Sequence, residues 1–308
     1  MRYDKVICWT INDVCNFNCE YCINHYRNKT VKPVEVDKFM KSLDDTNKTY
    51  KIVISGGEPF LVPNIVELSR AITERNYLVI VTNFILPSVI DFFNEVDRTN
   101  VTVVVSIHFD ELQKKGLFDR FIRNYHYAVE KGFDLDPRIV AYPGYIENLD
   151  KKLKILDGNN VKYFFTSFTG NYKGKVYPDS YTEEEIKLFN LSEQDLTKYK
   201  TRGIPCPAGW KVMVADSRGD VYPCYEFMFS SNNITSNVFD NIVFPYEKPV
   251  LCPFDKCGCP FFVYEKSLME EGDYKPVNCQ IVDKQIFSIK LGDYLRERRK
   301  VLSENKKS

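Results

Sequence analysis

Apolar residues in the first half of the chain follow two alternating spacings. Short apolar runs predict six strands, and between them apolar residues recur every three or four positions, the spacing of an amphipathic helix face. The predicted strands are Val6–Ile11, Ile52–Ser55, Leu78–Thr82, Val101–Ser106, Arg138–Ala141 and Val161–Phe165. The five predicted helix faces begin at Val36, Ile65, Val89, Phe118 and Leu149.

This alternation predicts an α/β fold with one parallel sheet, either open or curled into a barrel. It stops near residue 166: residues 166–181 are expected to form a loop and residues 182–200 a polar helix. Lys211–Ala215 and Val221–Phe227 flank a turn sequence and predict a β-hairpin, and a last helix is expected from Ile286. In parallel sheets, functional residues collect at the carboxyl ends of the strands.

Charge and hydropathy exclude several function classes. The 308 residues carry 42 Lys+Arg and 42 Asp+Glu, so the zero net charge leaves no electrostatic footprint for nucleic acid or an anionic membrane. No apolar stretch is long enough to span a bilayer, and the N-terminus has no apolar signal core. We therefore expect a soluble, cytoplasmic protein that binds neither nucleic acid nor membrane.

Ten cysteines are grouped along the chain, which favours metal binding over disulfides in a reducing compartment. Cys8 stands apart in an apolar run and is expected to be buried as a small hydrophobic residue. The first group is Cys15, Cys19 and Cys22; the second is Cys206, Cys224, Cys252, Cys257, Cys259 and Cys279.

The first group forms a C-x3-C-x2-C run directly after the first predicted strand. Three closely spaced thiolates can hold one face of an iron–sulfur cube and leave one iron without a protein ligand. Zinc, with His25 as a fourth ligand, is the alternative. Polar residues also end the next three strands: Ser55-Gly56-Gly57-Glu58-Pro59 after the second, Asn83 after the third, and Ser106 with His108 at the fourth.

These residues together resemble the radical S-adenosylmethionine (radical SAM) superfamily over about residues 6 to 166. The resemblance implies that Cys15, Cys19 and Cys22 hold a [4Fe–4S] cluster whose open iron chelates SAM. It implies that the motif Gly56, Gly57 and Glu58 receives the SAM amino group. It further implies that Tyr21 lies against the adenine, and that Ser106 and Asn83 face the ribose or methionyl part.

The resemblance also implies a fold, a chemistry and a partner. The superfamily fold is an incomplete (β/α)6 barrel, in agreement with the six strands read from the apolar pattern. The reduced cluster would cleave SAM to methionine and a 5′-deoxyadenosyl radical that abstracts hydrogen from the substrate. The electron would come from an external one-electron donor such as flavodoxin or ferredoxin.

The second cysteine group resembles the SPASM/twitch extension, in which Cys-x(n)-Gly-x4-Cys opens the motif and later cysteines complete auxiliary clusters. Cys206, Gly219 and Cys224 match the opening, but the downstream Cys-x4-Cys-x-Cys block departs from the full pattern. We expect one auxiliary [4Fe–4S] cluster held by Cys206, Cys224 and two of Cys252, Cys257 and Cys259, with Cys279 as a further candidate and structural zinc as the alternative.

Three further residues are candidates for substrate contact because they lie at the same rim of the sheet: His108, Tyr142 and Tyr172. The expected domains are a partial barrel with its substrate-side loops at 1–200, a cysteine-rich auxiliary domain at 201–285 and a C-terminal helix at 286–308.

The expected function is hydrogen abstraction from a small-molecule or sugar-like substrate, in a net oxidation whose second electron goes to the auxiliary cluster. The first strand begins by about Val6, without a preceding peptide-recognition domain, which favours that substrate class. The alternative is modification of a ribosomal peptide or protein side chain. An alternative of another class is a non-catalytic protein with structural zinc sites.

Overall fold

The computed structural model describes residues 3–22, 30–192, 196, 199–230, 233–257 and 277–278. Six strands form parallel pairs in the order of the chain. They are β1 (Lys5–Asn12), β2 (Tyr50–Gly56), β3 (Tyr77–Thr82), β4 (Val101–Ser106), β5 (Asp134–Ala141) and β6 (Phe164–Ser167). This order is that of the predicted partial barrel, so the predicted fold class is confirmed.

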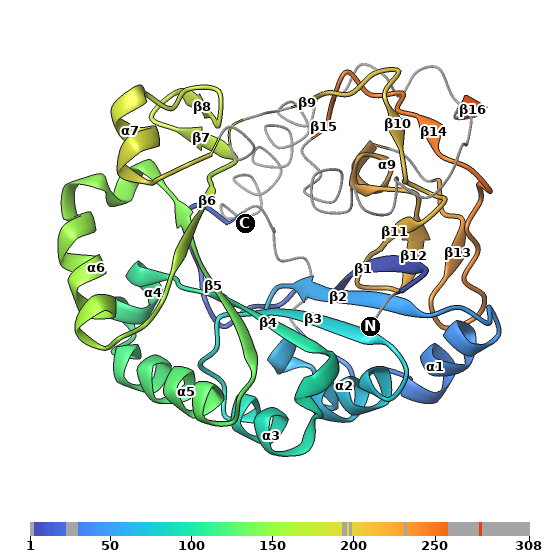
Figure 1. Cartoon of the computed structure of the whole chain (residues 1–308), viewed down its shortest axis with the longest axis horizontal. Helices are drawn as coiled ribbons and strands as arrows, with labels where there is room; N and C mark the ends of the chain where they lie inside the picture. Colours follow the sequence, from blue (N-terminus) through green and yellow to red (C-terminus); the bar gives the residue numbers. More distant parts are fainter. Residues whose placement is uncertain are drawn as a thin grey trace, which may run out of the picture.

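Helices cover the outer face of this curved sheet (Figure 1). The covering helices are α1 (Val36–Asp44), α2 (Ile65–Thr73), α3 (Ser88–Glu95), α5 (Phe118–Glu130) and α6 (Leu149–Gly158). Their apolar faces form one large core with every second residue of the strands, including Ile7, Ile54, Ile80 and Val103, each fully buried. A short helix, α4 (Phe109–Lys114), directly follows β4.

The inner face of the sheet carries a second, smaller core. Val6, Cys8 and Val53 contribute to it from β1 and β2, and the C-terminal extension contributes Val214 and Phe227. The burial of Cys8 as a small hydrophobic residue, expected from the sequence, is confirmed. Strand β1 is apolar along most of its length because both of its faces are covered.

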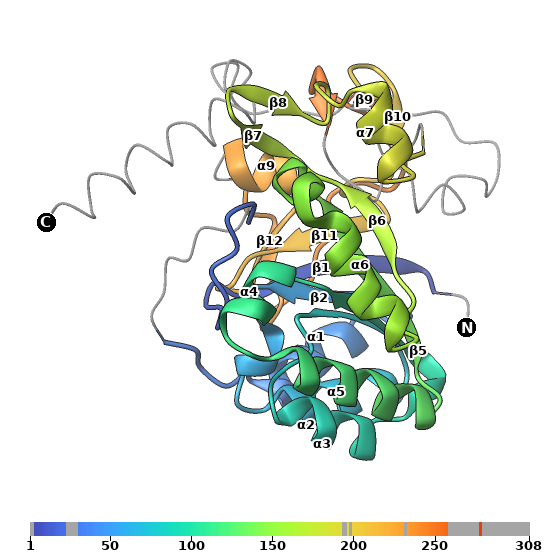
Figure 2. The ribbon, with the colours of Figure 1, turned by 90° about the vertical axis from the view of Figure 1, so that its left-hand side faces the viewer.

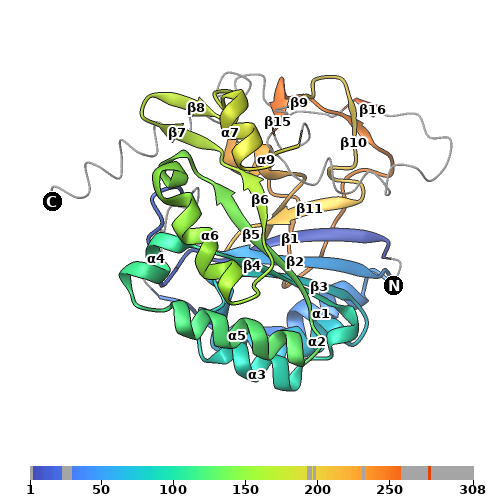
Figure 3. The same cartoon turned by 60° about the vertical axis from the view of Figure 1, so that its left-hand side comes forward.

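The extension continues the barrel sheet beyond β1. Strand β11 (Val212–Ala215) pairs in parallel with β1 (Figure 3). Strands β12 (Asp220–Tyr222) and β13 (Ser236–Asn237) follow in antiparallel order (Figure 1). Short pairs complete it: β9 (Tyr199–Lys200) with β15 (Lys256–Cys257), and β10 (Pro205–Cys206) with β14 (Val250–Leu251) and β16 (Val277–Asn278). Strands β11, β12 and β13 therefore belong to one sheet with the first six strands, whereas the short pairs form separate small sheets. The domain boundaries stay a prediction.

The structure differs from the expected elements in three places. Residues 166–181 contain a hairpin, β7 (Gly170–Tyr172) and β8 (Lys175–Tyr177), which Figure 2 shows above β6. The polar helix is shorter than expected, because α7 (Glu183–Leu188) ends soon after its Thr182–Glu185 capping box. The second strand of the predicted hairpin ends at Tyr222, and helix α9 (Tyr225–Ser230) replaces the rest.

Two further expectations concern the C-terminal helix and membrane-spanning segments. The predicted helix from residue 286 lies outside the described residues. Within the part of the chain that the structure describes, no helix is long and apolar enough to cross a membrane.

Candidate functional site

The cysteine loop and the Gly-Gly-Glu turn are joined by backbone hydrogen bonds. The Gly57 N–H donates to the Asn12 carbonyl (2.9 Å), and the Glu58 N–H donates to the Val14 carbonyl (2.8 Å). The buried side chain of Asn12 forms two further hydrogen bonds. Its Nδ2 donates to the Glu58 carbonyl, and its Oδ1 accepts from the Val14 N–H. The start of the cysteine loop is thus fixed on the end of β2.

Both glycines are required by this close approach. A Cβ on Gly57 would lie 2.0 Å from the Val14 carbonyl oxygen, and a Cβ on Gly56 would lie 2.4 Å from that of Asn12. Gly56 also has a φ of +135°, a conformation that side chains with a Cβ rarely adopt. The paired glycines therefore place the cysteine loop against the sheet.

The Glu58 carboxylate connects β2 to the end of β3. Its Oε1 accepts from the Phe60 N–H (3.0 Å) and the Thr82 hydroxyl (2.7 Å), and its Oε2 accepts from the Asn83 N–H (2.7 Å). Burial of the side chain, 1% exposed, raises the pKa of Glu58 to about 7, against the lowering effect of its three donors. In this structure Glu58 thus positions two strand ends through its own carboxylate.

Asn83 joins the end of β3 to the cysteine loop. Its Nδ2 donates to Asn16 Oδ1 (2.7 Å) and lies 3.9 Å from Cys15 Sγ. Its Oδ1 is buried and has no hydrogen-bond partner. A buried acceptor without a partner costs free energy, so this oxygen is suited to receive a ligand N–H or O–H beside the cysteines.

The three cysteines of the loop are half-buried, and no disulfide joins the cysteines whose side chains the structure describes. The Phe17 N–H donates to Cys15 Sγ (3.4 Å). Burial, followed by the neighbouring thiols Cys22 and Cys15, raises the pKa of Cys19 far above its usual value. A thiolate is therefore unfavourable there without a positive charge, which a bound metal centre supplies.

The donor set fits an iron–sulfur cluster rather than a single ion. Among the described residues no three His, Cys, Asp or Glu side chains converge on one metal position. The ligands of a cube bind different irons and need not converge. Together with the buried Asn83 oxygen, the three thiols fit a [4Fe–4S] cluster with SAM beside it. His25, the predicted fourth zinc ligand, lies outside the described residues.

His108 contacts the aromatic residue of the cysteine loop. The Tyr21 hydroxyl and His108 Nδ1 share a hydrogen bond of 2.8 Å, and their rings stack with centroids 5.9 Å apart. Burial lowers the pKa of His108 to about 4, so the imidazole is neutral near pH 7. His108 positions Tyr21, and its role in substrate contact stays a prediction.

The two other substrate candidates share an aromatic wall above β5. The rings of Tyr142 and Tyr172 lie 5.0 Å apart, and Tyr142 also contacts Tyr21 (5.2 Å) and Phe168 (5.2 Å). Tyr142 is 3% exposed, so its ring forms part of the wall of the site and does not extend toward a substrate. Tyr172 of hairpin β7–β8 is thus linked through Tyr142 to Tyr21 of the cysteine loop.

Two residues with a place in the site were not found from the sequence. Asn12 is the last residue of β1. Arg138 on β5 is the register partner of Ser106 on β4. Arg138 forms a two-nitrogen ion pair with Asp136 (2.9 and 2.6 Å). The sequence signal for Arg138 is its charge at the start of the predicted fifth strand, and its position level with Ser106 follows only from the strand register.

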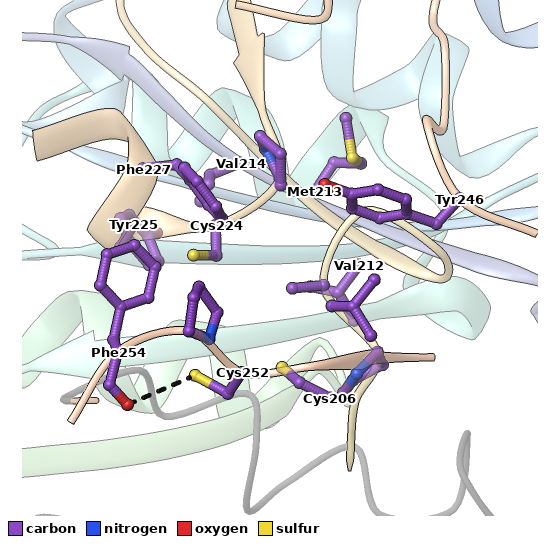
Figure 4. Close-up of a pocket in the computed structure, with 15 residues that line it drawn as sticks. Cys206, Val212, Met213, Val214, Cys224, Tyr225, Phe227, Tyr246, Cys252 and Phe254 are labelled. Carbon is purple, nitrogen blue, oxygen red and sulfur yellow. Dashed lines mark hydrogen bonds between the residues drawn. The ribbon is translucent and has the colours of Figure 1, made fainter. Parts of the chain in front are cut away.

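A second cluster of thiols lines an apolar pocket in the extension (Figure 4). Cys206 ends β10, Cys224 precedes α9, and Cys252 directly follows β14. Their sulfurs face one space walled by apolar side chains such as Val212 and Phe227. This arrangement brings together three of the predicted auxiliary ligands.

The other predicted auxiliary ligands are only partly covered. Cys257 lies on β15 with its backbone paired to β9, while its side chain is outside the description. Cys259 and Cys279 lie outside the described residues.

Sequence comparisons place this chain among known proteins. Residues 9–157 match the family model of the radical SAM superfamily. A protein of Methanocaldococcus jannaschii described as a glycyl-radical enzyme activating enzyme is 25% identical over 195 residues, 59% of this chain and 74% of that protein. The antilisterial bacteriocin subtilosin biosynthesis protein AlbA of Bacillus subtilis is 21% identical over 255 residues, 74% of this chain and 57% of AlbA.

Solved structures share the fold at low identity. SuiB of Streptococcus suis, bound to the precursor peptide SuiA, matches with a TM-score of 0.56 and 16% identity over 80% of this chain and 65% of SuiB. The enzyme anSMEcpe, with bound AdoMet and a peptide, matches with a TM-score of 0.55 and 17% identity over 76% of this chain and 77% of its own. The chain thus spans about two thirds of SuiB and little more than half of AlbA.

Proposed function

This chain belongs to the radical SAM superfamily and is an iron–sulfur enzyme, and we propose that it modifies a peptide or protein side chain. The observation that carries the proposal is the cysteine loop fixed on the Gly-Gly-Glu turn beside a buried, unpartnered acceptor, the Asn83 Oδ1. This arrangement supports binding of SAM at the carboxyl ends of β1 to β4.

Each group of residues has a defined task in this proposal. Cys15, Cys19 and Cys22 hold the [4Fe–4S] cluster, which, when reduced, supplies a 5′-deoxyadenosyl radical from SAM. Gly56 and Gly57 keep the loop close to the sheet, and Asn83 Oδ1 accepts a hydrogen bond from the bound SAM. The aromatic wall around Tyr142 excludes water from the carboxyl end of β5.

A peptide substrate has better support than the small or sugar-like substrate predicted from the sequence. SuiB is described in complex with a precursor peptide and anSMEcpe with a peptide, and AlbA is a bacteriocin biosynthesis protein. The half-buried ring of Tyr172, which packs against Tyr142, offers an aromatic surface at this rim on which a peptide side chain can pack. Net oxidation of the substrate remains part of the proposal.

The extension is proposed to hold one auxiliary [4Fe–4S] cluster. Cys206, Cys224 and Cys252 would supply three ligands, and Cys257 on the adjacent β15 is the first candidate for the fourth. The pocket is apolar, which disfavours the added negative charge of a reduced cluster and so favours a low reduction potential.

Three other predictions join the proposal: the domain boundaries at residues 200 and 285, an external donor such as flavodoxin or ferredoxin, and a cytoplasmic location.

Isotope transfer tests the substrate class. The reconstituted enzyme is reduced with SAM and either a short peptide encoded beside its gene or an aminocyclitol, each fully deuterated at carbon. Deuterium in 5′-deoxyadenosine together with a mass change of the peptide is expected. Deuterium that comes from the aminocyclitol and not from the peptide would restore the small-molecule prediction.

A further inference from the structure

A pocket separate from the thiol pocket lies between the cysteine loop and helix α4. Its volume is about 200 Å³. Glu20 and Tyr21 line it from the loop, Asp110, Glu111 and Lys114 from α4, and Tyr145 from the turn after β5. Typical small-molecule pockets measure roughly 300 Å³ or more, so this one is sized for a side-chain group.

Two buried polar side chains line this pocket. Glu111 is 5% exposed and its Oε2 accepts no hydrogen bond. Tyr145 is 1% exposed, and its hydroxyl interacts with the Tyr21 hydroxyl without reaching hydrogen-bond geometry. A buried carboxylate oxygen left without a hydrogen bond costs more than a neutral group would. Both groups can accept an N–H from one bound ligand.

The charges around the pocket favour a cation. Three carboxylates line it against one ammonium group, that of Lys114. Asp110 is already paired, because Lys152 Nζ donates to its Oδ1 (2.6 Å). Glu20 interacts with the Tyr142 hydroxyl, which leaves the buried Glu111 as the carboxylate without a partner group. A monovalent cation with several N–H donors would satisfy the buried oxygens and balance the charge.

We propose that this pocket binds the guanidinium or ammonium group of a basic side chain on the peptide substrate. The inference rests on the proposed function in one respect, that the group arrives on a peptide. A guanidinium can donate to Glu111 Oε2 and to the Tyr145 oxygen at the same time, and arginine is the better ligand because its donors are spread in a plane. The peptide would thereby be held beside the loop that carries Cys19 and Tyr21.

Calorimetry on the anaerobically reconstituted enzyme with SAM bound tests this site. The probe is a capped tripeptide with arginine at its centre, compared with the same peptide carrying citrulline, which has nearly the same shape without the charge. We expect the citrulline peptide to bind at least tenfold more weakly. Glu111→Gln should weaken the arginine peptide by about tenfold or more, because a charge-assisted bond is lost.

Two variants keep the result interpretable. Tyr145→Phe removes only one oxygen and should weaken binding severalfold, and Glu130→Gln, at the exposed end of α5, should leave it unchanged. Melting curves check that each variant is folded.

Equal affinity for the two peptides, equal affinity in the Glu111→Gln variant, or displacement of the peptide by potassium ions would overturn the proposal. If the peptide binds as expected but isotope transfer comes from the aminocyclitol, the pocket stands and the peptide-modifying function fails. If isotope transfer comes from a peptide and the arginine probe does not bind, only the pocket assignment fails.

Discussion

Replacing Gly57 by alanine should detach the cysteine loop from the sheet. The added Cβ would lie 2.0 Å from the Val14 carbonyl oxygen, against an ordinary carbon–oxygen contact of roughly 3.3 Å, so that carbonyl must move by about 1.3 Å. This movement breaks the hydrogen bonds from Gly57 to Asn12 and from Glu58 to Val14. Overpacking and the two lost bonds together cost about 4 kcal/mol.

Two measurements follow this change. The iron content after anaerobic reconstitution should fall toward the amount that the auxiliary cluster of the extension holds by itself. The affinity for SAM should drop by at least a hundredfold, which corresponds to about 2.7 of the 4 kcal/mol. Gly158→Ala is the matched control, because a Cβ there meets nothing within 4 Å. A Gly57→Ala enzyme that binds iron and SAM like the Gly158→Ala enzyme would refute the reasoning.

Three other predictions test neighbouring parts of the account. The pKa of Glu58 is raised from 4.5 to about 7 in the folded protein, so the free energy of unfolding should fall by at most about 3 kcal/mol as pH rises from 4.5 to 7. Glu58→Gln should flatten this slope in denaturation curves measured at a series of pH values. An unchanged slope in that variant would assign the pH dependence to another group. His108→Phe should lower the free energy of unfolding by about 1 kcal/mol, since the half-buried Tyr21 hydroxyl loses its hydrogen bond to the imidazole. Equal denaturation curves would contradict this. Changing Cys206, Cys224 and Cys252 together to serine should reduce the iron content from about eight to about four atoms per chain. The control Cys8→Ala should leave the iron content unchanged. About eight irons in the triple variant would place the second cluster elsewhere.

The barrel could be predicted from the sequence because its signals are local. An apolar run such as Val101–Ser106 is buried on one face by helices, and the structure gives β4 those same bounds. The sixth strand shows the limit: Val161 is buried but precedes the strand, which begins at Phe164, an edge residue 62% exposed. Burial and strand pairing coincide in the centre of a sheet and separate at its edge.

The site was predictable where chemistry needs a particular residue type at a fixed spacing. Cys15, Cys19 and Cys22 belong to this class, and so do the glycines at 56 and 57. The partners of Glu58 could not be predicted, because Thr82 and Asn83 meet it only when β2 and β3 lie side by side. The pairing of β11 with β1, more than 200 residues apart, is likewise a property of the assembled sheet.

The central claim is that the loop of Cys15, Cys19 and Cys22 carries all SAM cleavage. The most direct test is the formation of 5′-deoxyadenosine from SAM, measured with and without reductant in the wild-type enzyme and in a variant with these three residues changed to alanine. The account predicts reductant-dependent product in the wild type and none in the variant, which should still hold about four irons. Product formed at the wild-type rate by the triple variant would contradict the account.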